Sequence, residues 1–208
     1  MLTRLRRRLM GLVVALSMPF LPFPPNLLTI LGLLMSVLFL LSVRYEHLLL
    51  GLVFLLLSAY FDVIDGTVAR MRGVPTPGGA FLDSFTDRLS DVIYAFALLY
   101  LGFDAKWILA LASGALLVSY ARARAEGVLG TRLEGIGFME RAERLIAIIL
   151  VYLLFMLGYV KASLLVLYVT VALVWITVFH RFIVYFWMIS RSPPRAPWQW
   201  WPPPPGPP

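Results

Sequence analysis

Six long apolar stretches limit what this chain of 208 residues can fold into. They run at about 27–43, 48–61, 89–101, 107–121, 145–159 and 162–188. Each is close to the roughly 20 residues that an α-helix needs to cross a bilayer, once its polar ends are included. With 61% hydrophobic residues and a mean hydropathy of +0.86, the chain is too apolar for an ordinary soluble domain. We therefore predict an all-α integral membrane bundle of six transmembrane helices.

The two ends of the chain differ from this apolar body. The chain starts with a basic segment, TRLRRRLMGLVVALSMPF, which lacks the small-residue cleavage site of a signal peptide. We predict that residues 2–17 form an amphipathic juxtamembrane helix on the membrane surface. The chain ends in SPPRAPWQWWPPPPGPP, which is too rich in proline for a helix. We expect one membrane domain over residues 1–190 and an extended or disordered tail over 191–208.

Basic residues indicate the orientation in the membrane. If the amino terminus is cytoplasmic, the outer loops of a six-helix protein hold only Arg44, Lys106 and Lys161 of the 18 Lys and Arg residues. This bias predicts a multi-pass cell-membrane protein whose two termini, and whose acidic cluster described next, face the cytoplasm. The net charge of +7 then favours anionic headgroups and phosphates as partners, and we expect no nucleic acid.

Five of the six Asp residues lie within residues 62–91. The spacing is i,i+3 for Asp62 and Asp65 and i,i+4 for Asp83 and Asp87, so each pair shares a helix face. Such carboxylates repel one another in a low-dielectric setting unless a cation lies among them. Hard oxygen ligands without His or Cys favour Mg²⁺ or Mn²⁺. We therefore predict that these four Asp bind metal, and four carboxylates suit a site for two ions.

Small and basic residues surround the acidic pairs. Gly66 and Gly79 leave space for a ligand close to the backbone. Arg70 and Arg72 lie beside the carboxylates and can hold a diphosphate that the metals also bind. In an alternative, purely structural interpretation, the acids are only partners of arginines, but the cost of acids in a membrane argues against it.

Eight residues of this segment follow the pattern D-x2-D-G-x2-A-R-x8-G-x3-D-x3-D. They are Asp62, Asp65, Gly66, Ala69, Arg70, Gly79, Asp83 and Asp87. The pattern resembles the signature of the CDP-alcohol phosphatidyltransferases at all of its fixed positions. The resemblance implies a membrane enzyme that takes a CDP-linked lipid and an alcohol, forms a phosphodiester and releases CMP. It also implies that the four Asp bind two divalent metals, that Asp87 is the general base, and that the protein is a homodimer.

The resemblance extends to residues that hold the CDP-lipid. By similarity, Asn26 and Thr29 lie in the segment that opens the first helix and help to hold the nucleotide. Gly66, Arg70 and Thr76 match positions that touch the CDP group. Two simpler interpretations stay open, namely that Asn26 is the N-cap of the first helix and that Thr76 belongs to an ordinary turn.

A second basic set concerns the acceptor alcohol. Two segments, SYARARAE and ERAERL, resemble those of the family members that use inositol 1-phosphate as the acceptor. In those members, the residues that match Arg122, Arg124 and Arg181 bind the phosphate of the acceptor, and guanidinium groups suit that task. Alternatively, these arginines anchor helix ends to headgroups, and residues 140–144 form only a salt-bridged helix start. We expect His180 to be packed or interfacial.

Three functions are open on the sequence alone. The first is synthesis of an inositol phosphate lipid from a CDP-lipid, with CDP-archaeol as an alternative because few Asn, Gln and Cys hint at a thermophilic source. The second is the same reaction with glycerol 3-phosphate, serine or another alcohol. The third is a divalent-cation transporter, which acids at helix ends beside arginines disfavour. We expect the first.

Overall fold

The computed structural model describes residues 11–74, 76–133 and 136–192. Within these ranges the chain is helical and contains no strand, so the predicted all-α fold is confirmed. The elements are η1 (Met18–Phe20), α2 (Pro25–Arg44), α3 (Leu48–Met71), α4 (Pro77–Tyr100), α5 (Ala105–Leu129), α6 (Arg141–Met156) and α7 (Val160–Ser190). Each apolar stretch falls on one of the six long helices, although the stretch 145–159 runs beyond α6 into a turn.

Four of the described helices, α2, α3, α5 and α7, are long and apolar enough to cross a membrane. The other two differ for separate reasons. α4 has 24 residues, but its first two thirds carry Asp83, Asp87, Arg88 and Asp91. α6 has only 16 residues. The count of six spans therefore stays a prediction.

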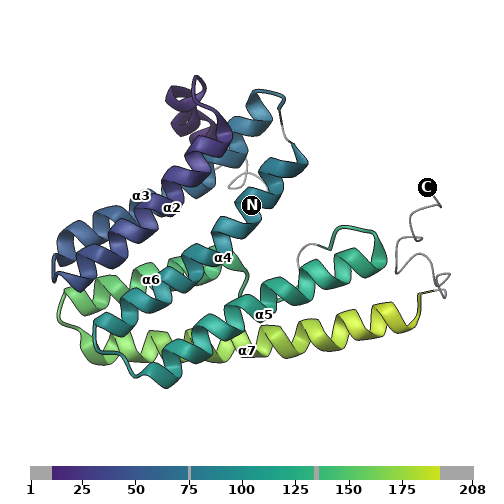
Figure 1. The fold of residues 1–208 in the computed structure, drawn as a ribbon. Helices are drawn as coiled ribbons and strands as arrows, with labels where there is room; N and C mark the ends of the chain where they lie inside the picture. The colour runs from purple at the N-terminus through teal and green to yellow at the C-terminus, as the bar shows by residue number, and fades with distance from the viewer. Residues whose placement is uncertain (1–10, 75, 134–135, 193–208) are drawn as a thin grey trace, which may run out of the picture.

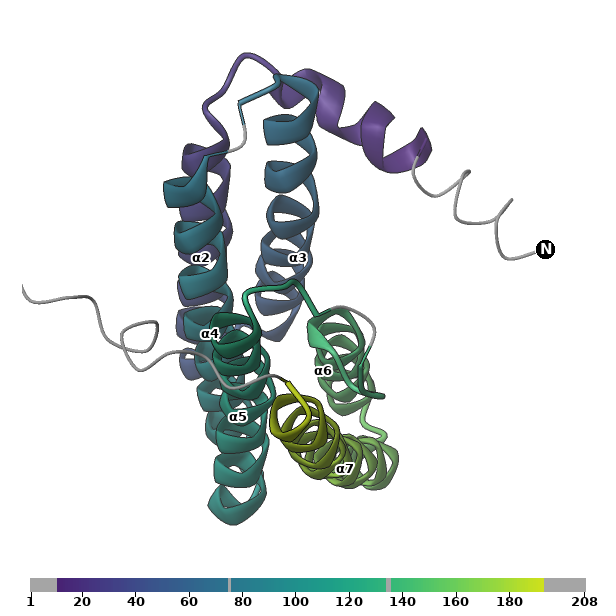
Figure 2. The same cartoon turned by 90° about the vertical axis from the view of Figure 1, so that its right-hand side faces the viewer.

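The six long helices form a closed ring. Going around it, α2 packs against α3, α3 against α6, α6 against α7, α7 against α5, α5 against α4, and α4 against α2 (Figures 1 and 2). Where α3 ends and α4 begins, α2, α3 and α4 diverge from α5 and α7 (Figure 1). The cavities described below lie at this end of the bundle.

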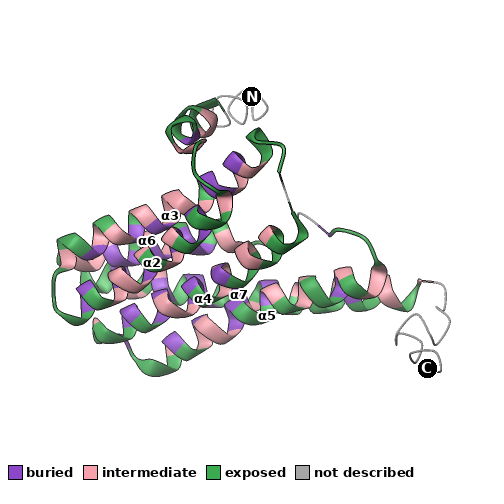
Figure 3. Cartoon of the chain, turned by 45° about the horizontal axis from the view of Figure 1, so that its top comes forward, coloured by how far each residue is buried: buried purple, intermediate pink, exposed green. Residues whose placement is uncertain are grey.

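Buried residues lie mainly on the inward faces of the helices (Figure 3). Large apolar side chains such as Leu109, Leu165 and Phe186 are exposed instead, each by more than half of its surface. So much exposed apolar surface suits contact with lipid and not with water.

Several polar side chains inside the ring form hydrogen bonds with other helices. The Ser58 hydroxyl donates to the Gly32 carbonyl at 2.7 Å and also shares a hydrogen bond with the Tyr94 hydroxyl at 2.7 Å. The Tyr152 hydroxyl donates to the Leu48 carbonyl at 2.7 Å. Since lipid offers no hydrogen bonds, such contacts stabilise helix packing within a bilayer.

A short helical segment precedes the ring. Residues 11–17 are helical and lead into η1. The Tyr60 hydroxyl donates to the Leu16 carbonyl at 2.7 Å, and Phe20 packs edge-on against Tyr60. This segment leaves the bundle at a large angle to α2 and α3 (Figure 2). The predicted surface helix over 2–17 begins outside the described residues, and most of the predicted tail, residues 193–208, also lies outside them.

Candidate active site

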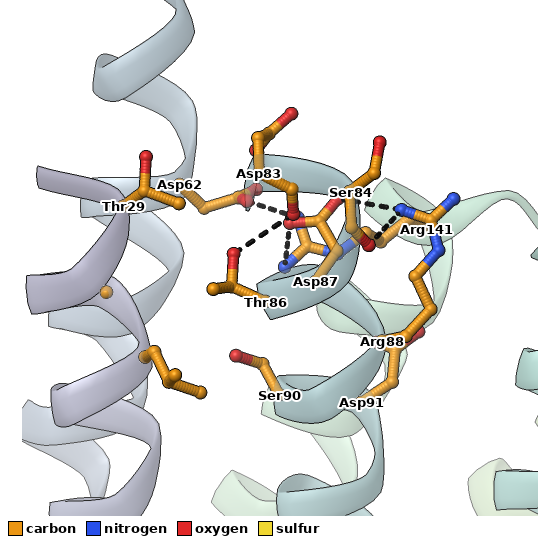
Figure 4. Close-up of polar contacts among 12 residues, drawn as sticks. Thr29, Asp62, Asp83, Ser84, Thr86, Asp87, Arg88, Ser90, Asp91 and Arg141 are labelled. Atoms are coloured by element: carbon orange, nitrogen blue, oxygen red, sulfur yellow. Dashed lines mark hydrogen bonds and ion pairs between the residues drawn. The ribbon is translucent and has the colours of Figure 1, made fainter. Parts of the chain in front are cut away.

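Three carboxylates meet where the end of α3 faces the first half of α4 (Figure 4). Asp62, Asp83 and Asp87 each offer an oxygen atom, and these atoms lie within 4.8 Å of one another. The start of α4 is fixed by its N-cap, Thr76, whose hydroxyl accepts a hydrogen bond from the Gly79 N–H at 3.0 Å. From this start, the i,i+4 spacing brings Asp83 and Asp87 to one side of α4.

Asp65 lies beside these three residues but is held differently. It is 3% exposed, and its carboxylate accepts hydrogen bonds from the Thr29 hydroxyl at 2.6 Å and from the Gly66 N–H. The bond to Thr29 joins α2 to α3. Asp65 and Thr29 line one small space together with Asp62 and Asp87. The structure thus brings three of the four predicted metal ligands together and places Asp65 next to them.

Arg141, the first residue of α6, also belongs to this cluster. Its guanidinium pairs with Asp62 and lies 3.1 Å from Asp87 (Figure 4). Arg88 lies 3.5 Å from the other oxygen of Asp87. Sequence reasoning did not assign Arg141 to the metal site. The signal that could have found it is the i,i+3 spacing of Arg141 and Arg144, which places two arginines on one side of a helix start.

The donor set of the cluster fits a divalent metal ion. Asp62, Asp83 and Asp87 supply hard oxygen ligands, and no His or Cys of the described residues joins them. Among the described residues, Arg141 and Arg88 form ion pairs with Asp62 and Asp87 but not with Asp83. Mg²⁺ and Mn²⁺ prefer oxygen ligands of this kind.

A buried ion pair positions α6 against α4. Arg144 Nη2 lies 2.6 Å from Asp91 Oδ2, and the two side chains are only 2% and 5% exposed. Arg144 also donates to the Met139 carbonyl at 3.3 Å. Because Arg144 follows Arg141 by three residues, the pair directs Arg141 toward the carboxylates. Asp91 is therefore a partner of Arg144. The ion pairs of residues 140–144 run to other helices and not to one another, and these residues also line a cavity described below, so they do more than form a salt-bridged helix start.

A cavity of about 500 Å³ lies beside the carboxylates, between α2, α3 and α4. All five residues that the resemblance assigns to the CDP-lipid line it, namely Asn26, Thr29, Gly66, Arg70 and Thr76. Asp65, Asp83 and Arg132 line it as well. Arg72 does not, because its guanidinium donates to the Phe23 carbonyl at 2.8 Å.

The starts of α2 and α4 come close together at this cavity. A Cβ atom on Gly79 would lie 3.1 Å from Asn26 Oδ1, a tight contact, so glycine at this position suits the close approach of the two helix starts. The N-cap of α2 is Pro24 and its first residue is Pro25. Asn26 therefore lies inside the first turn, and the interpretation that it is the N-cap is wrong. Proline suits the first helical position because its missing N–H has no helical partner there.

A larger cavity of about 820 Å³ lies between α4, α5, α6 and α7. Arg122 and Arg181, two of the three arginines assigned to the acceptor phosphate, line it. Arg124 is exposed and lines neither of the two cavities. His180 also lines neither cavity and packs against Phe138, with ring centroids 5.6 Å apart.

The arginines of the larger cavity are paired with acids. Arg122 lies 3.0 Å from Glu126, and Arg181 lies 2.9 Å from Glu140. Arg181 is 3% exposed and also donates to carbonyl groups of α5 and of the segment before α6, at 2.8 and 2.7 Å. Arg181 thus holds the fold together as well as lining the cavity.

The two cavities meet at the carboxylates. Asp83 lines both of them, and Asp87 lines the larger one. A ligand in each cavity would therefore approach the carboxylates from opposite sides. Such an arrangement can hold a phosphoryl donor and an acceptor hydroxyl at one metal-binding cluster, as phosphoryl transfer requires.

Sequences of known proteins agree with this geometry. The profile of the CDP-alcohol phosphatidyltransferase family matches residues 23–190. The chain is 39% identical to an archaetidylinositol phosphate synthase of Aeropyrum pernix over 64% of this chain and 68% of that protein. It is 35% identical to an archaetidylinositol phosphate synthase of Pyrococcus horikoshii over 76% of this chain and 80% of that one.

Solved structures agree as well. The crystal structure of a Mycobacterium tuberculosis phosphatidylinositol phosphate synthase with CDP-DAG bound matches with a TM-score of 0.70 and 29% sequence identity, over 84% of this chain and 93% of that one. The same enzyme in complex with manganese and citrate matches with a TM-score of 0.70, over 84% of this chain and 88% of that one. The chain therefore belongs to the CDP-alcohol phosphatidyltransferase family of enzymes.

Proposed function

We propose that this protein transfers the phosphatidyl or archaetidyl group of a CDP-lipid to a hydroxyl of inositol 1-phosphate and releases CMP. The observation that carries the proposal is that Asp83 lines both cavities while Asp87 lines the larger one. The names of the relatives, archaetidylinositol phosphate synthase and phosphatidylinositol phosphate synthase, support the choice of acceptor.

The smaller cavity is the proposed site of the CDP group. Asn26 and Thr76 flank it at the starts of α2 and α4, and Gly66 leaves room for a ligand beside α3. Arg70 supplies positive charge for the diphosphate. Thr29 acts through its hydrogen bond to Asp65. The relative that was solved with CDP-DAG supports this assignment.

The acidic cluster is the proposed metal site. Asp62, Asp65, Asp83 and Asp87 would hold two Mg²⁺ or Mn²⁺ ions, which supply positive charge to the diphosphate and to the departing CMP. The relative solved in complex with manganese supports this part of the proposal.

Asp87 is the proposed general base because it faces the larger cavity. Its two oxygens have different neighbours, Arg141 at 3.1 Å and Arg88 at 3.5 Å. One oxygen can therefore bind metal while the other accepts the proton of the attacking hydroxyl. The acceptor oxygen forms a bond to the lipid-linked phosphorus, the bond from that phosphorus to the CMP oxygen breaks, and CMP leaves with the electron pair.

The larger cavity is the proposed site of the acceptor phosphate. Arg122 and Arg181 line it, and guanidinium groups bind phosphate through charge-assisted hydrogen bonds. The assignment of Arg124 to the same phosphate stays a prediction, since its side chain lies on another face of α5. Glycerol 3-phosphate is the second candidate acceptor because it also carries a phosphate. A transporter is not proposed, because the two cavities meet at the cluster as a transfer reaction requires.

The arrangement in the membrane is proposed from the sequence and the family resemblance. The chain crosses the membrane six times, and residues 2–17 lie on its surface. Both termini and the acidic cluster face the cytoplasm, as the distribution of basic residues favours. The enzyme works as a homodimer.

Competition between acceptors tests the proposed function. Purified protein is incubated with a CDP-lipid, Mn²⁺ or Mg²⁺, and equal amounts of inositol 1-phosphate, glycerol 3-phosphate, serine and free inositol. We expect the product to contain mainly inositol phosphate. Equal use of free inositol, or a preference for glycerol 3-phosphate, would overturn the acceptor assignment and leave the enzyme family unchanged.

A further inference from the structure

Arg132 lines the smaller cavity, which is the proposed site of the CDP group. The other described residues that line this cavity lie between Pro24 and Asp83, on α2, α3, α4 and the segments beside them. Arg132 comes instead from the segment that follows α5, where the chain turns back (Figure 1). One arginine from the second half of the chain therefore contributes to a cavity that the first half builds.

The charges of the cavity lining favour a role for this arginine. Among the described residues, the charged side chains that line the cavity are Asp65, Asp83, Arg70 and Arg132. The diphosphate of a CDP-lipid is anionic, and two acids with a single arginine would present it with an excess of negative charge. Arg132 balances the acids and gives the diphosphate a second guanidinium, a group that suits phosphate oxygens.

The backbone on both sides of Arg132 is held in place. Gly130 ends α5 in the left-handed conformation, with a φ of 68°, and its N–H donates to the Glu126 carbonyl at 2.8 Å. Leu133 is 8% exposed and packs in an apolar cluster with Tyr185 of α7. Because the backbone is already ordered, only the side chain of Arg132 loses conformational freedom when it binds a ligand.

Glu126 makes the side-chain contact that ties this segment to α5. Its Oε1 accepts a hydrogen bond from the Leu133 N–H at 2.8 Å and another from Arg122 Nε at 3.0 Å. Glu126 lines the larger cavity and not the smaller one. A residue in the wall of the proposed acceptor site thus fixes the segment whose arginine reaches the proposed donor site.

We propose that Arg132 binds the diphosphate of the CDP-lipid, and that Glu126 is a positioning residue that holds Arg132 at the smaller cavity. This inference rests on the proposed function, which places the CDP group in that cavity. In a competing interpretation, Arg132 only anchors its segment to lipid headgroups, as arginines near helix ends commonly do. The two interpretations differ in CDP affinity, because a headgroup anchor does not touch the nucleotide.

The first measurement is the affinity for CDP, by calorimetry on the full-length protein in detergent with Mn²⁺ at a fixed concentration and no acceptor. Arg132→Gln should bind CDP about tenfold more weakly than the wild type, because a charge-assisted contact to phosphate is lost. Arg132→Lys keeps the charge and should lose less. Since Arg132 is exposed, we expect both variants to keep the Tm of the wild type.

Arg191→Gln is the matched control for this measurement. Arg191 stacks on Trp187 at the end of α7 and lines neither cavity, so the variant should bind CDP as the wild type does. Equal CDP affinity of Arg132→Gln and the wild type would overturn the inference and leave the donor cavity standing. Failure of the wild type to bind CDP at all would refute the proposed donor cavity itself.

The second measurement is the CDP affinity of Glu126 variants. Glu126→Ala should bind CDP about as weakly as Arg132→Gln, although Glu126 does not line the smaller cavity. Glu126→Gln keeps an oxygen that accepts from the Leu133 N–H, so its affinity should stay within about twofold of the wild type. If Glu126→Ala does not fold, Glu126→Leu, which keeps bulk but has no acceptor oxygen, replaces it.

A double variant tests whether the two residues act through one contact. Adding Glu126→Ala to Arg132→Gln should cause no further loss of CDP affinity, because the guanidinium that Glu126 positions is already gone. Additive losses would overturn the positioning role of Glu126. Normal CDP binding by Glu126→Ala would overturn it as well.

Discussion

At the scale of single residues, Asp83 and Asp87 lie on neighbouring turns of α4 but differ in the cavities that they line. Asp83 lines both cavities, whereas Asp87 lines only the larger of the two and contacts Arg141 and Arg88. Asp83 is therefore placed to serve donor and acceptor, and Asp87 to serve the acceptor hydroxyl. The two carboxylates are expected to respond differently to the same substitution.

Asp87→Asn keeps the size of the side chain but removes its ability to accept a proton. We expect kcat to fall by about 10²–10⁴-fold, the usual contribution of a general base, with little change in the KM for CDP-lipid. Steady-state release of CMP measures both constants. Asp104→Asn, at an exposed acid at the start of α5, is the control and should leave both unchanged. A loss of CDP-lipid affinity as large as the loss of turnover would show that Asp87 is only a ligand.

Arg122 and Arg181 are expected to differ when each is replaced by Ala. Arg122 is partly exposed and pairs with Glu126 one turn away on α5, so Arg122→Ala should raise the KM for inositol 1-phosphate by about 10- to 100-fold and lower the Tm less than Arg181→Ala does. Arg181 is buried and binds two carbonyl groups, so Arg181→Ala should also lower the Tm. Thermal unfolding in detergent, beside kinetics, tests this. A fall in Tm for Arg122→Ala with no change in KM would contradict its role in the acceptor site.

At the scale of elements, α6 connects the two halves of the site. Its first turn carries Arg141 to the carboxylates and Arg144 to Asp91. The sequence predicted α3 and α4 as the carriers of the metal ligands from the spacing of Asp62, Asp65, Asp83 and Asp87. It did not predict that the start of α6 returns to them, because local spacing says nothing about which distant helix packs on α3.

Helix boundaries were predictable only in part. Apolar stretches located the helices, but Pro25 and Pro77, which begin α2 and α4, set where two of them start. Asn26 has the residue type of a good N-cap, yet Pro25 already occupies the first helical position and moves the cap to Pro24. The residues assigned to CDP by resemblance line one cavity because the starts of α2 and α4 lie close together. This contact between two separate helices could not be predicted from local sequence patterns.

The buried pair of Asp91 and Arg144 should matter for stability. Asp91→Asn leaves a buried guanidinium without its charge partner, and we expect the free energy of unfolding to fall by about 3–5 kcal/mol. Thermal or denaturant unfolding in detergent measures this. Lys106→Ala, which breaks the exposed pair with Asp104, should change stability little. Equal effects of the two substitutions would contradict the structural role given to the buried pair.

At the scale of the whole molecule, the ring of helices explains why two cavities share one cluster. α4 belongs to the wall of both cavities, with α2 and α3 on one side and α5, α6 and α7 on the other. Hydropathy predicted the membrane bundle, but not the order of helices around the ring. That order depends on packing between segments far apart in the chain, such as α3 against α6.

Metal removal should affect the whole molecule, because the carboxylates join α3, α4 and α6. EDTA should abolish CMP release because it removes the metal ions. It should also lower the Tm relative to saturating Mn²⁺, since a ligand at a concentration of about 100 times its Kd stabilises a folded protein by roughly 2.7 kcal/mol. Adding excess Mn²⁺ should restore both. Asp62→Asn should lose most of the Mn²⁺-dependent rise in Tm. Full activity in excess EDTA would refute the metal mechanism.

The central claim is that the donor and the acceptor react at the acidic cluster, where Asp83 lines both cavities. The most direct measurement is the stoichiometry of the products, by mass spectrometry, after incubation of purified protein with CDP-lipid, inositol 1-phosphate and Mn²⁺. We expect one CMP for each lipid that carries inositol phosphate, and neither product from Asp87→Asn above a small residual rate. Release of CMP without an inositol phosphate lipid would contradict the account.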